Sequence, residues 1–374
     1  MKKAYITGAI ILLVVISGSF AVYEHENGPE AKYQKGLSYY KEKNYKKALP
    51  LFKESAKQNY APAEAKLGYM YKHGLGVSRD EDKAAYWFKK AAHQGNALGE
   101  AGLGYMYLFG KGGVSKDYKK ALYWAKKAVK QGDAKGEADL GYMYQYGLGV
   151  PQDYSKALYW FKKAAEQGYA AAENNLGYMY EEGLGVPQHY SKALYWYKKA
   201  AEQGDAKGEY NLGYMYGEGL GVPQDYSKAL YWYKKAAEQG DAAAENNLGY
   251  IYLFGKGGVS KDYQTALYWI KKAVEQGYAA AENNLGYMYE EGLGVPQDYS
   301  KALYWFKKAA ERGNAGGENN LGVMYGEGLG VPQDYSKAIY WTKKAAEQGY
   351  AQAKANLEYF ESEYLFGGNW GLPP

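Results

Sequence analysis

Apolar and polar residues follow a pattern of about 36 residues that recurs along most of the chain. Its clearest marker is a segment of the type Leu-Gly-Tyr-Met-Tyr, whose apolar residues at i, i+3 and i+4 are typical of one face of an α-helix. Successive copies lie 36 or 37 residues apart, which predicts a solenoid of stacked helical repeats. The leucine of this segment stands at Leu67, Leu103, Leu140, Leu176, Leu212, Leu248, Leu285 and Leu321.

Each repeat begins with a first helix, called helix A below. In the repeat that contains Leu140, the residues Leu140, Met143 and Tyr144 share one helical face. The glycines and the proline of residues 147–151 then end the helix, because glycine favours left-handed turns and proline lacks the amide hydrogen.

The second helix of each repeat, helix B, is predicted over residues 154–167 of the same copy. Asp153 is a suitable N-cap because its carboxylate can accept the free amide hydrogens of the first turn. Gly168 is a suitable residue just beyond the C-terminus. The apolar stripe of this helix is Ala157, Trp160, Phe161 and Ala164. Aspartates at the equivalent N-cap position are Asp117, Asp225, Asp262, Asp298 and Asp334.

Small and large residues recur at fixed places in the pair. Gly141 lies inside helix A, where glycine costs roughly 1 kcal/mol relative to alanine, so we expect it to allow a close approach of the partner helix. We expect Trp160 and its equivalents to fill the gap between helices as part of the core. A single helix pair cannot bury its own apolar stripe, so stability must come from stacking on neighbouring repeats.

The motifs Leu-Gly-x-x-Tyr, Gly-x-Gly-Val and Asp-Tyr-x-x-Ala-x-x-Trp, followed by Ala-Ala and Gly, resemble the Sel-1-like repeat, a relative of the tetratricopeptide repeat. The resemblance covers residues from about 61 to 349. It implies an all-α fold, a right-handed α-solenoid of stacked helix-turn-helix repeats, that acts as a scaffold or adaptor for protein partners. The resemblance also implies that the protein functions in the bacterial cell envelope or is secreted. One disulfide-stapled subgroup differs from this chain, which has no cysteine.

The repeats suggest a division of the chain into five parts. Residues 1–23 form a signal peptide or membrane anchor, and residues 24–29 form a linker. Residues 30–60 form a tetratricopeptide-like hairpin that lacks the Gly-x-Gly-Val loop. Residues 61–348 hold eight Sel-1-like repeats, and residues 349–374 hold a capping helix and a tail.

The N-terminal segment has the features of an export signal. Lys2 and Lys3 precede an apolar run, and Ala21 ends a small-x-small cleavage motif. The uncharged residues 4–23 are also long enough to serve as an uncleaved anchor in the inner membrane. The two interpretations remain open, and in both the repeats are exported to the periplasm or beyond the cell.

Charge and composition argue against several classes of function. The formal net charge is +5, and lysines are spread through every helix B rather than clustered, which argues against nucleic-acid binding. The chain has four histidines at unrelated repeat positions and no cysteine, so we expect no metal site and no cofactor. No sequence feature decides the oligomeric state.

Two alternatives to a scaffold follow from particular features. Ser38 and Lys41 spell the Ser-x-x-Lys motif of serine β-lactamases, which would suit an envelope enzyme acting on cell-wall or β-lactam substrates. The companion Ser-Asp-Asn and Lys-Thr-Gly motifs are missing, so we expect no catalytic residues. A third alternative is a structural role through self-association of the solenoid ends.

Helix A lines the concave face in tetratricopeptide-like solenoids, so we expect positions −2, +2, +5 and +6 from the repeat leucine to face a partner. Amide side chains there could bind an extended backbone, and tyrosines offer rigid contact area. Alternatively, the rows merely reflect recent copying of one repeat. The candidates are Tyr105, Phe109, Tyr142, Tyr146, Asn174, Tyr178, Glu182, Tyr210, Tyr214, Glu218, Asn246, Tyr250, Phe254, Asn283, Tyr287, Glu291, Asn319 and Glu327.

The candidate face changes character along the chain. Its first part is apolar and weakly basic, with Lys72, His73 and Phe109, whereas the part after Asn174 is rich in amides and acidic at positions such as Glu291. We therefore expect the partner to be a protein or peptide segment in extended form, apolar opposite Phe109 and basic opposite the second half.

Overall fold

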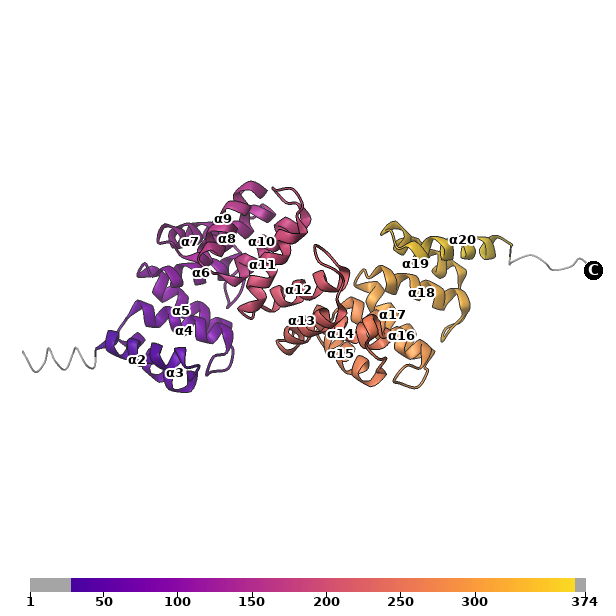
Figure 1. Ribbon diagram of the computed structural model, residues 1–374, viewed down its shortest axis with the longest axis horizontal. Helices are drawn as coiled ribbons and strands as arrows, with labels where there is room; N and C mark the ends of the chain where they lie inside the picture. The colour runs from indigo at the N-terminus through magenta and orange to yellow at the C-terminus, as the bar shows by residue number, and fades with distance from the viewer. Residues whose placement is uncertain (1–27, 367–374) are drawn as a thin grey trace, which may run out of the picture. The chain divides into compact units, whose positions relative to one another are not determined.

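The computed structural model describes residues 28–366, so the predicted signal or anchor segment lies outside the described residues. Nineteen α-helices, α2 to α20, and the short 3-10 helix η1 form this part of the chain, in which no residue belongs to a strand (Figure 1). The prediction of an all-α repeat fold is confirmed.

Helices A and B alternate along the chain, and each is 13 residues long. The A helices are α2 (Pro29–Lys41), α4 (Ala61–His73), α6 (Ala97–Phe109), α8 (Ala134–Tyr146), α10 (Ala170–Glu182), α12 (Ala206–Glu218), α14 (Ala242–Phe254), α16 (Ala279–Glu291) and α18 (Ala315–Glu327). The B helices are α3 (Tyr45–Lys57), α5 (Glu81–His93), α7 (Tyr118–Lys130), α9 (Tyr154–Glu166), α11 (Tyr190–Glu202), α13 (Tyr226–Glu238), α15 (Tyr263–Glu275), α17 (Tyr299–Glu311) and α19 (Tyr335–Glu347). The others are η1 (Lys256–Gly258) and α20 (Ala351–Phe366).

The loop from helix A to helix B owes its shape to glycine and glutamine. Gly147 and Gly149 both adopt left-handed φ angles, +67° and +70°. A Cβ on Gly149 would lie 2.9 Å from the carbonyl oxygen of Tyr118, at the start of the preceding helix B. Gln152 Nε2 donates to the carbonyl oxygen of Gln145 at 2.8 Å. The loop therefore folds back on helix A and packs against the previous repeat.

The helix B termini confirm the predicted caps. Asp153 accepts a hydrogen bond from the amide of Lys156 at 2.9 Å, and the other predicted aspartates cap their helices in the same way. His189, which replaces aspartate before α11, makes no side-chain cap. Gly168 follows the end of α9 with φ +75°, as its predicted role requires.

The glycine inside helix A marks a close contact with helix B, as predicted. A Cβ on Gly141 would lie 2.7 Å from the ring of Phe161, which is fully buried. Tryptophan packs between helices, as predicted, but at a different contact from the one that this glycine makes. Trp160 is half-buried and packs on a cluster that includes Ala121 and Ala125 of the preceding helix B. Consecutive positions of a helix point about 100° apart, so only one of the two rings can meet the glycine.

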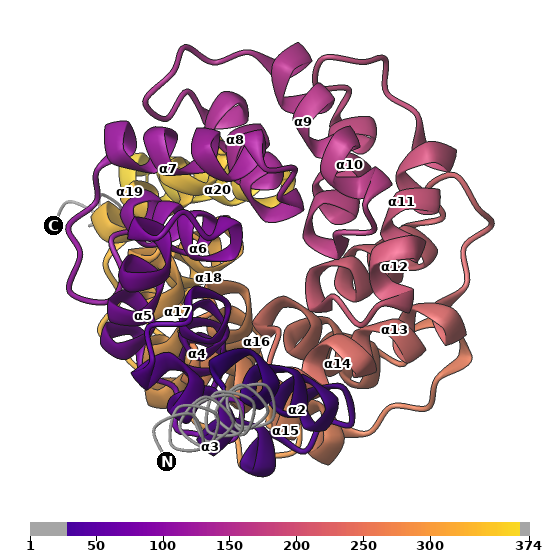
Figure 2. The same cartoon turned by 90° about the vertical axis from the view of Figure 1, so that its left-hand side faces the viewer.

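The chain divides into two compact units, residues 1–188 and 189–374, and each is described by itself below. Successive A helices contact one another: α4 with α6 and α6 with α8 in the first unit, and α14 with α16 and α16 with α18 in the second. Successive B helices of the described residues contact one another less, and in each unit the A helices lie on the inner side (Figure 2). Each unit is thus a stretch of right-handed α-solenoid whose concave face is made by helices A.

The ends of the described chain use the same contacts. In the first hairpin, a Cβ on Gly36 would lie 2.7 Å from the Phe52 ring. At the other end, the ring of Phe360 on α20 is buried, and a Cβ on Gly326 of α18 would collide with it. Helix α20 therefore covers α18 and α19 where the repeats stop.

Candidate partner-binding face

Aromatic side chains from successive A helices meet on the concave face of the first unit. The ring centroids of Tyr105 and Phe109 are 4.7 Å apart on α6, and those of Tyr142 and Tyr146 are 4.6 Å apart on α8. Phe109 lies 5.5 Å from Tyr142, so it joins the two pairs. The four candidate residues form one continuous aromatic strip across two repeats.

The second unit has a shorter strip at equivalent positions. The ring of Phe254 lies 4.7 Å from Tyr250 on the same helix and stacks on Tyr287 of the next helix A at 5.7 Å. Tyr214 and Tyr250 keep more than a third of their surface exposed. Positions +2 and +6 of neighbouring repeats are therefore brought together in these two places, and their contact with a partner stays a prediction.

The acidic candidates also face solvent on this side. Glu182 ends α10 in the first unit, and Glu218, Glu291 and Glu327 end A helices of the second unit; all four are exposed. Glu290 is half-buried beside Glu291, and burial, with repulsion from Glu291 as the second cause, raises the pKa of its carboxyl group. In the second unit the last turns of α12, α16 and α18 are thus acidic, whereas α14 ends in Leu253 and Phe254.

The row at position −2 is different, because it is buried between repeats. Asn246 and Asn319 are almost fully covered, and their side-chain oxygens accept hydrogen bonds from Asn284 and Asn356 of the following helices at 2.9 Å each. Asn283 receives a similar bond from the next repeat. These amides join consecutive repeats in the structure, and their predicted contact with a partner stays a prediction. Asn174 is buried and Tyr210 is half-buried.

A group of cations surrounds Tyr105 in the first unit. The ammonium nitrogen of Lys72 lies 3.6 Å from the ring centroid, that of Lys135 lies 4.6 Å away and that of Lys111 lies 5.9 Å away. Burial, with the Lys135 charge as the next cause, lowers the pKa of Lys72 to about 7. Burial and the Lys72 charge lower the pKa of His73 to about 4, so this imidazole is neutral at physiological pH.

On the convex face, sequence reasoning missed a repeated arrangement of three side chains. Tyr159 is 52% exposed and meets Trp160 edge to face, with 4.9 Å between centroids. The ammonium of Lys163 lies within 6 Å of both rings. Equivalent tyrosine–tryptophan pairs occur on α5, α7, α11, α13, α15, α17 and α19. The convex face is therefore aromatic as well as basic.

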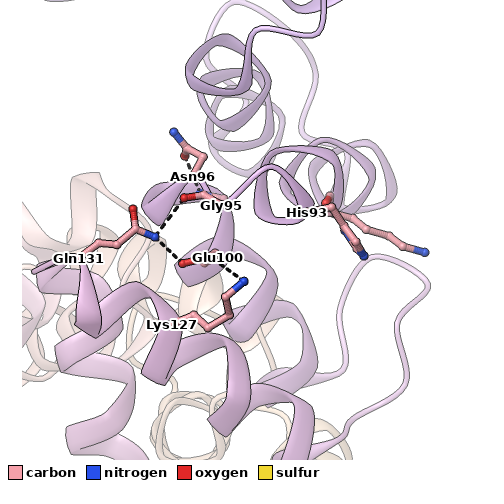
Figure 3. A network of polar contacts seen from close by, with 8 residues as sticks. His93, Gly95, Asn96, Glu100, Lys127 and Gln131 are labelled. Atoms are coloured by element: carbon pink, nitrogen blue, oxygen red, sulfur yellow. Dashed lines mark hydrogen bonds and ion pairs between the residues drawn. The ribbon is translucent and has the colours of Figure 1, made fainter.

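A buried carboxylate at the start of each repeat helix A from α4 to α18 is the second feature that was missed. Glu100 is fully buried; Gln131 Nε2 donates to it at 2.7 Å, and the Lys127 ammonium lies 3.0 Å away (Figure 3). Gln131 also donates to the carbonyl oxygen of Gly95, in the turn before α6. Because a buried charge must be paired, this network fixes helix A against helix B and the preceding turn.

The network varies in its cation. Lys90 and Lys344 pair with their glutamates as Lys127 does, and Arg312 pairs with Glu282 at 3.1 Å. Where only the glutamine bond is made, as at Glu137, burial raises the pKa of the carboxyl group. The signal was visible, since glutamate stands three residues before every repeat leucine, with Gln or Arg 30 or 31 residues later.

The alternative catalytic pair lies on the surface of the first hairpin. Ser38 and Lys41 are both exposed on α2. A separate cleft of about 570 Å³ lies on the helix B side of the first unit, lined by Asn59, Tyr86, Lys89, Lys90, His93 and Gln94. Across residues 28–366, no three acidic, histidine or cysteine side chains gather as a metal site would need, and none of the helices has the length and apolar character to cross a membrane.

Two solved structures of bacterial proteins are similar to this chain. A Sel1 repeat protein from Oxalobacter formigenes is 34% identical, with 82% of this chain and 90% of that one covered and a TM-score of 0.53. A protective antigen of uropathogenic Escherichia coli strains is 32% identical, with 91% of this chain and 81% of that one covered and a TM-score of 0.47.

Among curated proteins, a 45-residue segment is 49% identical to the ERAD-associated E3 ubiquitin-protein ligase component HRD3 of Candida glabrata, and covers 12% of this chain and 5% of that protein.

The model of the Sel1 repeat matches nine consecutive segments, which together span most of the chain. They are residues 23–60, 61–96, 97–133, 134–169, 170–205, 206–241, 242–278, 279–314 and 315–350. The chain therefore belongs to the Sel1 repeat family.

Proposed function

We propose that this protein is a non-enzymatic scaffold that binds an extended segment of a protein partner on the concave faces of its repeats. Sel1 repeat proteins generally mediate protein–protein interactions, and the family is typically non-catalytic. Beyond these family properties, we propose which face binds the partner, that the bound segment is extended, and that the protein works outside the cytoplasm.

One observation carries the choice of face: side chains of successive repeats form continuous rows on helices A. The Phe109 ring connects the tyrosines of α6 with those of α8, and the Phe254 ring connects Tyr250 with Tyr287. A row that crosses repeat boundaries suits a ligand that runs along the stack, because neighbouring contacts then lie one repeat apart. Tyrosines supply rigid contact area with little loss of conformational entropy.

We place the scaffold outside the cytoplasm. Support comes from the basic residues Lys2 and Lys3, the apolar run after them and the cleavage motif at Ala21. The protein is periplasmic or secreted, with residues 4–23 as its inner-membrane attachment if the segment is retained. Fusion of a reporter after Tyr60 tests this, since a reporter active only in the cytoplasm contradicts export.

The binding face is tested by charge reversal in the second unit. Full-length protein and the double variant Glu291→Lys with Glu327→Lys serve as baits for partners from the native cell envelope. The variant should capture at least tenfold less partner, and wild-type capture should fall with salt, because exposed charges are screened beyond a Debye length of about 8 Å at physiological ionic strength.

The matched control reverses two charges on the convex side of the same unit, Lys234→Glu with Lys235→Glu on α13. Lys235 lies over the rings of Tyr231 and Trp232. This variant should capture the partner as the wild type does. If it is the damaging change and the glutamate variant is not, the convex face binds the partner and the proposal is wrong.

A further inference from the structure

The cations around Tyr105 are an unusual feature of the first unit. Three ammonium groups lie within 6 Å of one ring centroid, from the end of α4 (Lys72), the loop after α6 (Lys111) and the start of α8 (Lys135). Their charges repel one another, and the face of one phenol ring offers each only a weak attraction. Such an arrangement costs free energy unless anions are present.

The carboxylates nearby only partly neutralise this group. Asp139 pairs with Lys135 at 2.7 Å, and Glu81 pairs with Lys111 at 3.2 Å and also binds Arg79. Lys72 has no carboxylate within 4.0 Å among the described residues. The carboxylate of Asp133 also lies close enough to Lys135 for the two charges to interact. Four cations and three carboxylates leave a charge of +1 when Lys72 is protonated, on the side of the unit where a partner segment is proposed to run.

We propose that Lys72, Lys111 and Lys135 around Tyr105 form an anion-binding site, which takes the carboxylates of an acidic stretch in the extended partner segment. This inference rests on the proposed function, because it names the group that the first unit recognises. The site lies beside the strip of Tyr105, Phe109 and Tyr142, so an apolar side chain next to the acidic residues would pack on Phe109.

Carboxylate fits this site better than phosphate does. Phosphate sites in proteins usually draw on free backbone amides at helix N-termini, whereas the helix that begins here, α8, has its Gly136 amide bonded to the carboxylate of Asp133. The cluster already holds carboxylates in the manner proposed, as the contact of Asp139 with Lys135 shows. Ammonium groups on flexible stems can adjust to two separate carboxylates.

The test uses full-length protein and three probes: an acetylated and amidated peptide Gly-Glu-Glu-Phe-Gly, its Gly-Gln-Gln-Phe-Gly counterpart, and inorganic phosphate. Titration calorimetry at low salt and pH 6, where Lys72 is mostly protonated, should show binding of the acidic peptide. The glutamine peptide should bind at least tenfold more weakly. Lys72→Met should weaken the acidic peptide at least tenfold, whereas Lys163→Met, which removes an equal charge and a similar ring contact on the convex face, should leave it unchanged.

Several results would overturn the inference. Absence of acidic-peptide binding, or equal binding of the two peptides, contradicts carboxylate recognition. If inorganic phosphate binds more tightly than the acidic peptide, the site recognises phosphate and the assignment of carboxylate is wrong. If Lys72→Met and Lys163→Met weaken binding of the acidic peptide equally, the binding depends on the net charge of the protein and not on this cluster. The charge-reversal experiment on the second unit decides the proposed function separately, because none of its variants touches this cluster.

Discussion

The concave face carries opposite charges at the start of the first unit and in the second unit, although the same pairs of helices build both. In the first unit, the last turn of α4 places Lys72 beside Lys111 and Lys135. In the second unit, the last turn of α16 has Glu290 and Glu291 at the positions that Lys72 and His73 occupy in α4. The comparison teaches that the residues which build the repeat and those which face a partner are separate sets, so one can vary while the other is kept.

The largest expected effect tests the shared framework. Gly141→Leu in the first unit and Gly286→Leu in the second should each cost roughly 1–3 kcal/mol, because an added Cβ would lie 2.7 Å from a buried phenylalanine ring in both. Thermal and urea unfolding of the two variants measure this. Equal losses mean that both units depend on the same close contact, and an unchanged unfolding curve for either would show that its helices separate without cost.

The second prediction concerns pH and sharpens the contrast in charge. Binding of an acidic peptide to the first unit should weaken severalfold between pH 6 and 8, because Lys72 loses its proton around its pKa of about 7. Burial is the main cause of that lowering. The charges of Lys135, Lys111 and Arg79 add to it, Asp139 opposes it, and His73 stays neutral throughout this range.

Binding of a basic peptide to the second unit should show the opposite trend. The pKa of Glu290 is raised, so this carboxyl group begins to take up a proton at a higher pH than an ordinary glutamate does, and the attraction fades as the pH falls. Calorimetry of both peptides on the same protein across pH 4–8 measures the two trends. Parallel pH dependences would mean that the two faces do not differ as described.

The smallest effect is a gain in stability on removing the unpaired cation. Lys72 has a folded pKa below its unfolded value, so burying its charge costs stability below pH 7, and the cost disappears as the pH rises toward the ordinary value of 10.5. Lys72→Met should therefore stabilise the protein by about 1 kcal/mol at pH 6. The gain should shrink at higher pH. Lys163→Met is the control, and a loss of stability in Lys72→Met would show that the cluster serves the fold.

The helix pairs of the repeats and the loops between them were largely predictable, because the sequence features that specify them act over a few neighbouring residues. The N-cap at Asp153 depends on a carboxylate within reach of the first-turn amides, and Gly147 on a backbone angle that other residues rarely adopt. The candidate face was predictable in part. The rows of aromatic residues on helices A could be read from the fixed positions in each repeat, whereas the contact of Phe109 with Tyr142 and the burial of Asn246 and Asn319 between repeats could not.

The buried carboxylates and the close contact of the helix A glycine depend on contacts between residues far apart in the chain. Glu100 looks like an ordinary surface glutamate until the end of α7 brings Lys127 and Gln131 over it. Trp160 and Phe161 both look like core residues, and only the rotation of α9 against α8 decides which ring meets Gly141.

The sequence by itself determined the repeat, the ends of its helices and the family, because caps, turns and periodic apolar residues act over a few residues and recur in every copy. Only the tertiary structure decided which side chains meet across repeats: the amides that join neighbours, the carboxylates that become buried, and the three lysines gathered on Tyr105. The physical reason is that burial and charge pairing depend on distances in space, which a 36-residue period leaves open until the helices are packed.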